Sequence, residues 1–298
     1  MPHNVGYCCI NTTLNKQGIT TNRGMIQRTF IEKGLSYASE LALANARDLV
    51  KIIRWNAQQN IRVFRVSSDI FPWGSHYNID NLPDADKISE TLAEAGALAQ
   101  ATNQRITAHP DHFVKLGSEK DHVVENSIKD LELHSTIFDM MGLEASPYNA
   151  LNIHVGMNYS SEVTDRWIKN VEKLSPNCRA RLVVENDDKA NAYSIVQLVE
   201  IFKEVHTPIT FDYFHHTFHD SGLSSEAAAH LAAATWPSDI DPLFHYSESK
   251  NLNENVSGNP RAHADYVFNK IEDFGLTIDI DLEAKAKELA LFKYWEIV

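Results

Sequence analysis

Apolar residues gather in eight short runs that recur roughly every 30 to 45 residues along the chain. The runs cover residues 5–11, 62–76, 105–113, 150–156, 181–187, 209–216, 242–248 and 276–285. Each is rich in apolar and β-branched residues over a length typical of a buried strand. The pattern therefore predicts eight strands separated by enough chain for a helix in each interval.

Helical periodicity is visible in several of these intervals. Leu49, Ile52, Ile53 and Asn56 recur at helical spacing in residues 38–59, as do Val124, Ile128 and Leu131 in residues 123–141, and Leu282, Ala286 and Leu289 near the end. Ser160 and Ser161 before Glu162 predict a helix start, and Gly142 predicts a helix stop.

Strand–helix alternation repeated eight times predicts a (β/α)8 TIM barrel, in a single domain spanning residues 1–298. The alternative is a doubly wound open sheet. No GxGxxG or GxxxxGK[ST] motif follows any predicted strand, which disfavours that alternative and a nucleotide cofactor.

Seven of the predicted strands end on histidine, aspartate or glutamate. The candidate ligands are His76, His109, His154, Glu185, Asp212, His215, His245, His263 and Glu283. In a TIM barrel the carboxyl ends of the strands converge on one mouth, where the active site lies. Imidazole and carboxylate accept zinc, manganese or iron. Nine ligands exceed the four to six of one ion and suit two or three ions sharing a carboxylate.

A histidine near a strand end is more often a hydrogen-bonded core residue than a ligand. His216 and His219 are ambiguous, because they are close to His215 but one or more residues past the ligand spacing. The recurrence of ligand-type residues at consecutive strand ends favours a metal cluster. Such clusters polarise a phosphoryl group and activate water, and paired metals hold both the attacking and the leaving oxygen. Phosphodiester hydrolysis is the reaction that this arrangement favours.

The bulk composition restricts the partners. A net charge of −13 disfavours nucleic acid, although bound cations would supply positive charge where a phosphate lies. No segment approaches 18 uninterrupted apolar residues, so no membrane partner is expected. Three cysteines without a CxxC pair fit a reducing compartment. We expect an intracellular, cytoplasmic protein that acts as a monomer.

Several segments resemble the UV damage endonuclease family. They read GYCCINTTL, FRVSSDIFPWGSH, AHPDHF, NIHVG, VVEND, FDYFHH, LFHYSE, AHADY and DIDLEAKAKE. The resemblance runs nearly end to end and implies a barrel related to the endonuclease IV type of abasic-site nuclease. It implies nicking of damaged double-stranded DNA immediately 5′ to pyrimidine dimers and 6-4 photoproducts. It also implies up to three divalent metals, manganese first and zinc as the alternative.

The resemblance also implies roles for individual residues. Glu185 would be the bridging carboxylate, completing one metal site with His109 and His154. Asp212, His245 and Glu283 would form a second site, His215 and His263 would hold a third metal, and His76 would line the same pocket. Glu185, His109 and Lys285 would be the catalytic residues.

Other residues would contact DNA by the same resemblance. Tyr7 and Asn11 would face the lesion. Lys285 and Lys287, expected on a helix, would meet phosphate or form a solvated helical face. Arg65 would hold a phosphate or a barrel carboxylate.

Two positions depart from the family pattern. Asp111-His112-Phe113 replaces a family loop that reads Gly-Gln-Tyr or Gly-Gln-Phe, whose last two residues wedge into the duplex opposite the lesion. The resemblance therefore implies lesion contacts by His112 and Phe113. Leu243 stands where the family has a lysine, two residues before His245.

Three rival functions remain open from the sequence. A metal-dependent sugar isomerase of the related barrel class fits the acidic charge better and the histidine-rich ligand set worse. An abasic-site endonuclease of the endonuclease IV type would use the same ligands. A non-catalytic protein that binds distorted DNA is disfavoured by the complete ligand set.

Overall fold

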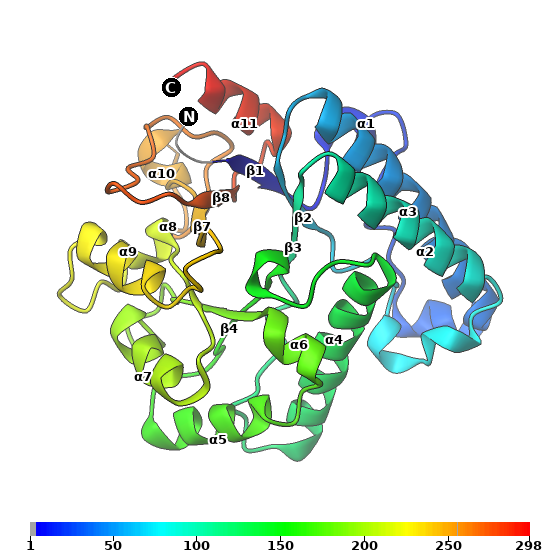
Figure 1. Ribbon diagram of the computed structural model, residues 1–298, viewed down its shortest axis with the longest axis horizontal. Helices are drawn as coiled ribbons and strands as arrows, with labels where there is room; N and C mark the ends of the chain where they lie inside the picture. The colour runs from blue at the N-terminus through cyan, green and yellow to red at the C-terminus, as the bar shows by residue number, and fades with distance from the viewer. Residues whose placement is uncertain (1–3, 255) are drawn as a thin grey trace.

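The computed structural model describes residues 4–254 and 256–298. In this part of the chain, eight parallel strands form one sheet that curls into a nearly closed barrel, with helices around it (Figure 1). The strands are β1 (Val5–Cys8), β2 (Val63–Val66), β3 (Arg105–Ala108), β4 (Leu151–His154), β5 (Leu182–Glu185), β6 (Ile209–Thr210), β7 (Leu243–Tyr246) and β8 (Asp279–Leu282). Their order is β6-β5-β4-β3-β2-β1-β8-β7, so the predicted TIM barrel is confirmed.

Helices fill the intervals between the strands. They are α1 (Thr12–Asn15), α2 (Gln27–Gln58), α3 (Ala85–Ala101), α4 (Asp121–Met140), α5 (Ser161–Val171), α6 (Pro176–Arg181), α7 (Ile195–Val205), α8 (Tyr213–His216), α9 (Ser225–Ala233), α10 (Lys250–Asn253) and α11 (Glu288–Trp295), with short 3-10 turns η1 (Gly74–His76), η2 (Ile79–Asn81) and η3 (Pro147–Asn149). Ser160 caps α5 by accepting a hydrogen bond from the Val163 amide, as predicted. Gly142 follows α4 with a φ of +67°, which ends the helix.

The predicted helix through Leu282, Ala286 and Leu289 is wrong in its first half. Leu282 is the last residue of β8, and α11 begins only at Glu288. Ile280 and Leu282 alternate with polar residues and pack in the outer core, which is strand periodicity. Lys285 and Lys287 therefore lie in the turn between β8 and α11 rather than on a helix.

Side chains alternate between two faces of each strand. Ile106, Ile153 and Phe211 belong to the large core between the sheet and the helices. A smaller apolar cluster fills the barrel interior and consists of Val63, Ala150, Val183, Trp236 and Leu243. Leu243, the position at which the family pattern has lysine, is thus a fully buried interior residue.

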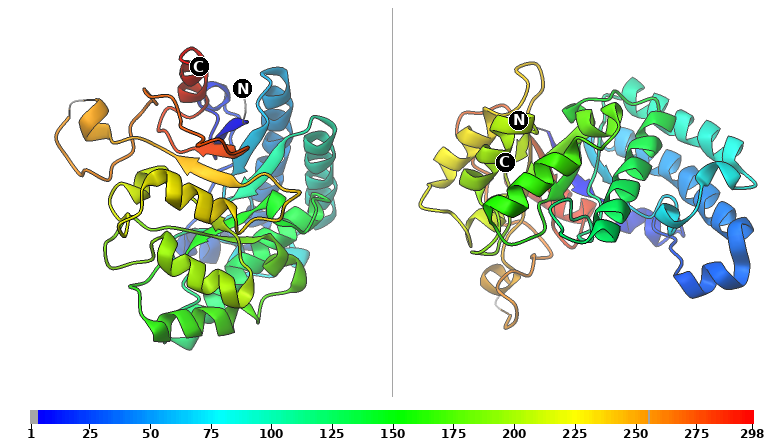
Figure 2. Two further views of the ribbon diagram at one scale, coloured as in Figure 1. Left: turned by 60° about the vertical axis from the view of Figure 1, so that its left-hand side comes forward. Right: turned by 90° about the horizontal axis from the view of Figure 1, so that it is seen from below.

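The barrel closes between β6 and β7, where the two strands do not form a continuous ladder of hydrogen bonds. In the described chain these two strands are joined by an isolated parallel bridge between Asp212 and His245, with the His245 amide 3.0 Å from the Phe211 carbonyl oxygen. The long connection from β7 to β8, which carries α10, projects from the body (Figure 2). No helix in the described residues has the length and apolar character that crossing a membrane requires.

Candidate metal centre

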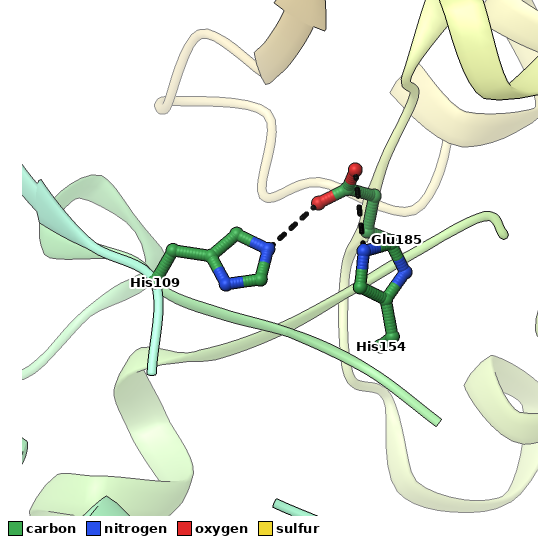
Figure 3. A group of neighbouring side chains, drawn as sticks. All are labelled: His109, His154 and Glu185. Carbon is green, nitrogen blue, oxygen red and sulfur yellow. Dashed lines mark hydrogen bonds and ion pairs between the residues drawn. The ribbon is translucent and has the colours of Figure 1, made fainter. Parts of the chain in front are cut away.

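Glu185 is the last residue of β5 and is 1% exposed. Two imidazoles approach its carboxylate, one from the end of the adjacent strand β4 and one from the residue that follows β3 (Figure 3). His109 Nε2 lies 3.3 Å from Oε2, and His154 Nε2 lies 3.7 Å from Oε1. His154 is directly opposite Glu185 in the parallel ladder of β4 and β5, so the strand register itself brings these two together.

Two further imidazoles approach the same carboxylate. His215 Nδ1, from α8, lies 3.2 Å from Glu185 Oε1. His245 Nδ1, from β7, lies 3.0 Å from Oε2. Each oxygen of the carboxylate therefore faces two histidines.

Asp212 follows β6 and is held by the residue after Glu185. The Asn186 side chain accepts from the Asp212 amide at 2.8 Å and donates to its carbonyl oxygen at 3.0 Å. Asp212 Oδ1 in turn accepts from the His215 amide at 2.7 Å, capping α8. Its other oxygen is buried without a hydrogen-bond partner among the described residues.

Glu283, just after β8, approaches the same ring nitrogen of His245 that faces Glu185. Arg65 Nη1 lies 2.6 Å from Glu283 Oε1, and His245 Nδ1 lies 3.5 Å from the same oxygen. His263 Nδ1 lies 3.6 Å from Oε2 and 3.0 Å from the Glu283 carbonyl oxygen. Of the two partners expected for Arg65, the structure shows the barrel carboxylate.

Burial and charge act against each other in this cluster. Burial favours the protonated form of Glu185, but His245 and His154 outweigh it and hold the pKa of Glu185 well below its usual range. Burial favours neutral His245, but the Glu185 carboxylate outweighs it and raises the pKa of His245 to about 9. Burial raises the pKa of Asp212 to about 6, although His215 opposes this shift. In the metal-free protein, a proton on His245 therefore offsets part of the negative charge of the buried carboxylates.

The donor set fits divalent metal ions. Two groups have ligand atoms that all lie within 4.8 Å of one another, namely His109, His154 and Glu185, and Glu185, Asp212 and His215. Glu185 Oε1, Asp212 Oδ2 and both ring nitrogens of His245 are buried without hydrogen-bond partners among the described residues. Buried polar atoms are normally paired, so unpaired lone pairs that converge here indicate ligands.

The division into groups differs from the expected one in one respect. His109, His154 and Glu185 come together as expected. The second group joins His215 to Asp212 and Glu185, because Asp212 caps the short helix that carries His215. The ring of His215 also lies beside that of His263, as expected, with ring centroids 6.4 Å apart. His263 comes from the β7–β8 connection and not from a strand end.

Three of the histidines singled out from the sequence lie outside this cluster. His76 stacks on Trp73 with ring centroids 4.3 Å apart, and it lines a different cavity, of about 800 Å³. None of its described contacts reaches Glu185, because η1 carries it ten residues past the end of β2. His216 is buried against Phe211 and lies 3.1 Å from the Leu223 carbonyl oxygen. His219 contacts Ser221, so neither ambiguous histidine replaces a proposed ligand.

The structure buries Tyr7 and Asn11, which were expected to face DNA. Tyr7 is 0% exposed, and its hydroxyl donates to Asn56 Oδ1 at 2.8 Å and accepts from Asn11 Nδ2 at 2.9 Å. Asn11 caps α1. The expectation is corrected, because in β1 the strand alternation directs Tyr7 toward the helices and leaves Cys8 facing the interior.

The predicted loop and lysine are accessible. Phe113 is 70% exposed, and its ring centroid lies 4.1 Å from that of His112. His112 lines a cavity of about 240 Å³ together with His109, His154 and His215, which places the loop beside the cluster. Lys285 is exposed in the turn before α11.

Two polar residues inside the strands contact the proposed ligands but were not identified from the sequence. Asn152 contacts the Glu185 carboxylate through its side-chain amide, and Asp281 lies with its Oδ2 3.9 Å from His245 Nε2 while accepting from Thr107 at 2.9 Å. Each of these residues lies two positions before a proposed ligand, on the same inward face. A polar residue two before a strand-end ligand is the signal that could have found them.

The fold and the cluster define a class: a TIM barrel with a histidine–carboxylate centre, able to bind metal, at the carboxyl ends of its strands. A sequence profile described as UV-endonuclease UvdE matches residues 3–297, and the chain belongs to this family. It is 33% identical to a UV-damage endonuclease of Schizosaccharomyces pombe, over 97% of this chain and 49% of that protein. It is 30% identical to a UV DNA damage endonuclease of Nostoc sp., over 96% and 88%.

Solved structures agree with this assignment. The crystal structure of SacUVDE matches with a TM-score of 0.84 and 29% identity, covering 99% of this chain and 97% of that one. A D-psicose 3-epimerase from Clostridium cellulolyticum matches with a TM-score of 0.53 and 12% identity over 78% of each chain. The second similarity shows the shared barrel alone.

Proposed function

We propose that this protein is a DNA repair endonuclease that cuts damaged double-stranded DNA immediately 5′ to UV photoproducts, including pyrimidine dimers and 6-4 photoproducts. The single observation that carries the proposal is the Glu185 carboxylate, which is buried and faced by four imidazoles. This arrangement suits a carboxylate shared between divalent ions, and the proposal joins it to membership of the UV-endonuclease family. Manganese is the proposed metal, with zinc as the alternative.

Divalent metals bound here would activate water and neutralise the charge that develops on the phosphate. Glu185 and the surrounding histidines would hold them, with Asp212 and Glu283 completing the set. Lys285 is exposed in the turn that follows Glu283, where an ammonium group can bind a phosphate oxygen of the strand.

Recognition of the lesion is assigned to the loop that carries His112 and Phe113. Phe113 projects into solvent with 70% of its surface exposed, and aromatic rings stack on unpaired bases. His112 shares a cavity with three histidines of the metal centre. A damaged, weakly stacked dinucleotide costs less to displace from the helix than an intact one, which would provide selectivity.

The test is incision of an end-labelled duplex that carries one defined thymine dimer, with manganese present or chelated. We expect a single nick directly 5′ to the dimer, only with metal, and no cleavage of the undamaged duplex. Glu185→Gln should lower the rate by at least about a hundredfold, since it weakens a ligand at the centre of the cluster. His206→Asn is the matched control, because His206 is exposed at the other end of the barrel, before β6.

Three other outcomes would redirect the proposal. Efficient cleavage of an abasic-site duplex without cleavage at the dimer would indicate an endonuclease IV type activity. Binding of the dimer duplex without any incision by metal-loaded protein would indicate a non-catalytic binding protein. Neither binding nor incision would favour a sugar isomerase, and ketose and aldose substrates would then be assayed.

A further inference from the structure

Asn152 lies inside the barrel, directly beneath the metal centre. It belongs to β4, two residues before His154, and the strand alternation directs both side chains inward. It is 1% exposed. Its side-chain nitrogen Nδ2 donates to Glu185 Oε2, the oxygen that also faces His109 and His245.

The chemistry of the two groups fixes which end of the amide faces Glu185. An ionised carboxylate only accepts hydrogen bonds, so the amide nitrogen must be the partner. The amide oxygen of Asn152 is left buried without a hydrogen-bond donor among the described residues. An unpaired buried oxygen costs about 1–3 kcal/mol, so the contribution of Asn152 to the stability of β4 does not account for an asparagine at this position.

A donor at this place orients the Glu185 carboxylate. Rotation about the last side-chain bond would otherwise exchange or tilt the two oxygens. With Oε2 held by Asn152, Oε1 is directed at His154 and His215, while Oε2 is directed at His109 and His245. A carboxylate that joins two metals must present its oxygens in two such directions.

The amide also has the correct charge for this position. An aspartate would repel Glu185 on the adjacent strand and compete for the metals, and an alkyl side chain would provide no donor. An asparagine donates without adding charge to a cluster that already contains several buried carboxylates.

We propose that Asn152 is a positioning residue for the metal centre, which orients the Glu185 carboxylate for binding two ions. This inference rests on the proposed function, because it assumes that Glu185 binds metal. Residues that orient metal ligands through hydrogen bonds typically change metal affinity or activity by about 10- to 100-fold when they are replaced.

The experiment compares Asn152→Leu and Asn152→Asp with wild type and with Asn149→Leu. Asn149 is an asparagine three residues earlier, 3% exposed, whose Nδ2 donates to the Ile106 carbonyl oxygen at 3.0 Å. It is matched in residue type and burial, but its partner is backbone and it touches no proposed ligand. Folding is checked by circular dichroism and urea unfolding of the chelator-treated proteins.

Manganese binding is measured by calorimetry, and kcat and KM are measured on the dimer duplex. We expect both Asn152 variants to bind manganese at least about tenfold more weakly than Asn149→Leu. We expect kcat to fall by a similar factor while KM for DNA stays within about twofold, since Asn152 is remote from the DNA-facing surface.

Equal manganese affinity and equal kcat in the Asn152 and Asn149 variants would overturn the inference. If Asn152→Leu does not fold, Asn152→Asp decides, because it keeps the side-chain size while it removes the donor and places a second carboxylate beside Glu185. Failure of the wild-type protein to bind manganese or to cut the dimer duplex would instead reject the proposed function, so the two failures are distinguishable.

Discussion

Asp212 and His245 form the bridge that joins β6 to β7 in the described chain, and both are proposed metal ligands. The other neighbouring strands of the barrel are paired within the continuous sheet. Closure of the barrel and assembly of the metal centre therefore depend on the same two residues. A metal bound there would add a bond across a seam that an isolated bridge joins.

The first prediction concerns this seam. Backbone amides of residues 209–216 and 243–246 should exchange with deuterium faster after chelation and become protected again when manganese is added. Amides of β1 and β2, which are paired in the continuous sheet, should change little. Uniform protection over the whole barrel, or none, would show that the metal does not act on the seam.

The second prediction concerns proton release. The proton on His245 is stabilised by Glu185, which raises the pKa of His245 to about 9. Because this pKa lies above its ordinary value of 6.5, the protonated ring stabilises the metal-free fold fully below pH 6.5, and this contribution is lost as pH rises through about 9.

Metal must displace this proton, so manganese binding at pH 7 should release protons and its apparent affinity should rise with pH. Calorimetry in buffers of different ionisation enthalpy measures the release. In His245→Gln the pH dependence of unfolding of the chelated protein should flatten between pH 6.5 and 9. An unchanged pH dependence in this variant would assign the effect to another group.

The third prediction concerns the buried ion pair of Arg65 and Glu283, whose side chains are 10% and 14% exposed. Arg65→Met should destabilise the chelated protein by about 3–5 kcal/mol, because it removes the guanidinium that lies closest to a buried carboxylate. Manganese should stabilise this variant by more than it stabilises wild type, since the ion would compensate the Glu283 charge. Urea unfolding with and without metal measures both increments, and equal increments would remove Glu283 from the ligand set.

The fourth prediction concerns Phe113. Phe113→Ala should leave stability and manganese affinity unchanged, because the ring is exposed. It should weaken binding of the dimer duplex by about 5- to 150-fold, the loss expected for one base-stacking contact of about 1–3 kcal/mol. Fluorescence anisotropy of labelled duplex provides the measurement. Leu231→Ala, an exposed apolar residue on α9, is the control, and equal affinities of the two variants would exclude a stacking role.

Most of the fold could be predicted from the sequence, because its signals are local. All eight predicted strand segments contain a strand of the barrel, and the helix in residues 123–141 appears within two residues of its predicted ends. The last helix was misplaced because Leu282, Ala286 and Leu289 match a helical spacing by chance across a strand and a turn. The residues around Leu282 follow the two-residue period of a strand. Three apolar residues are too few to distinguish this period from that of a helix.

The sequence predicted which residues form most of the candidate site, but it did not predict which of them contact one another. The sequence pointed to Glu185 and the histidines around it because strand ends in a TIM barrel share one mouth. It left open whether Arg65 meets phosphate or a barrel carboxylate, and it placed Tyr7 at the DNA. The direction of a side chain depends on which face of its strand is turned inward, and a shift of one residue reverses that.

The sequence by itself therefore determined the number and order of strands and the residue types that end them, since these follow from hydrophobic period and polar interruption. Only the tertiary structure decided that Asn152 meets Glu185, that Arg65 meets Glu283, and that Asp212 and His245 close the barrel. These contacts join residues that are 33, 218 and 33 positions apart. Such pairs are set by the stagger and closure of the whole barrel, which no local stretch of sequence contains.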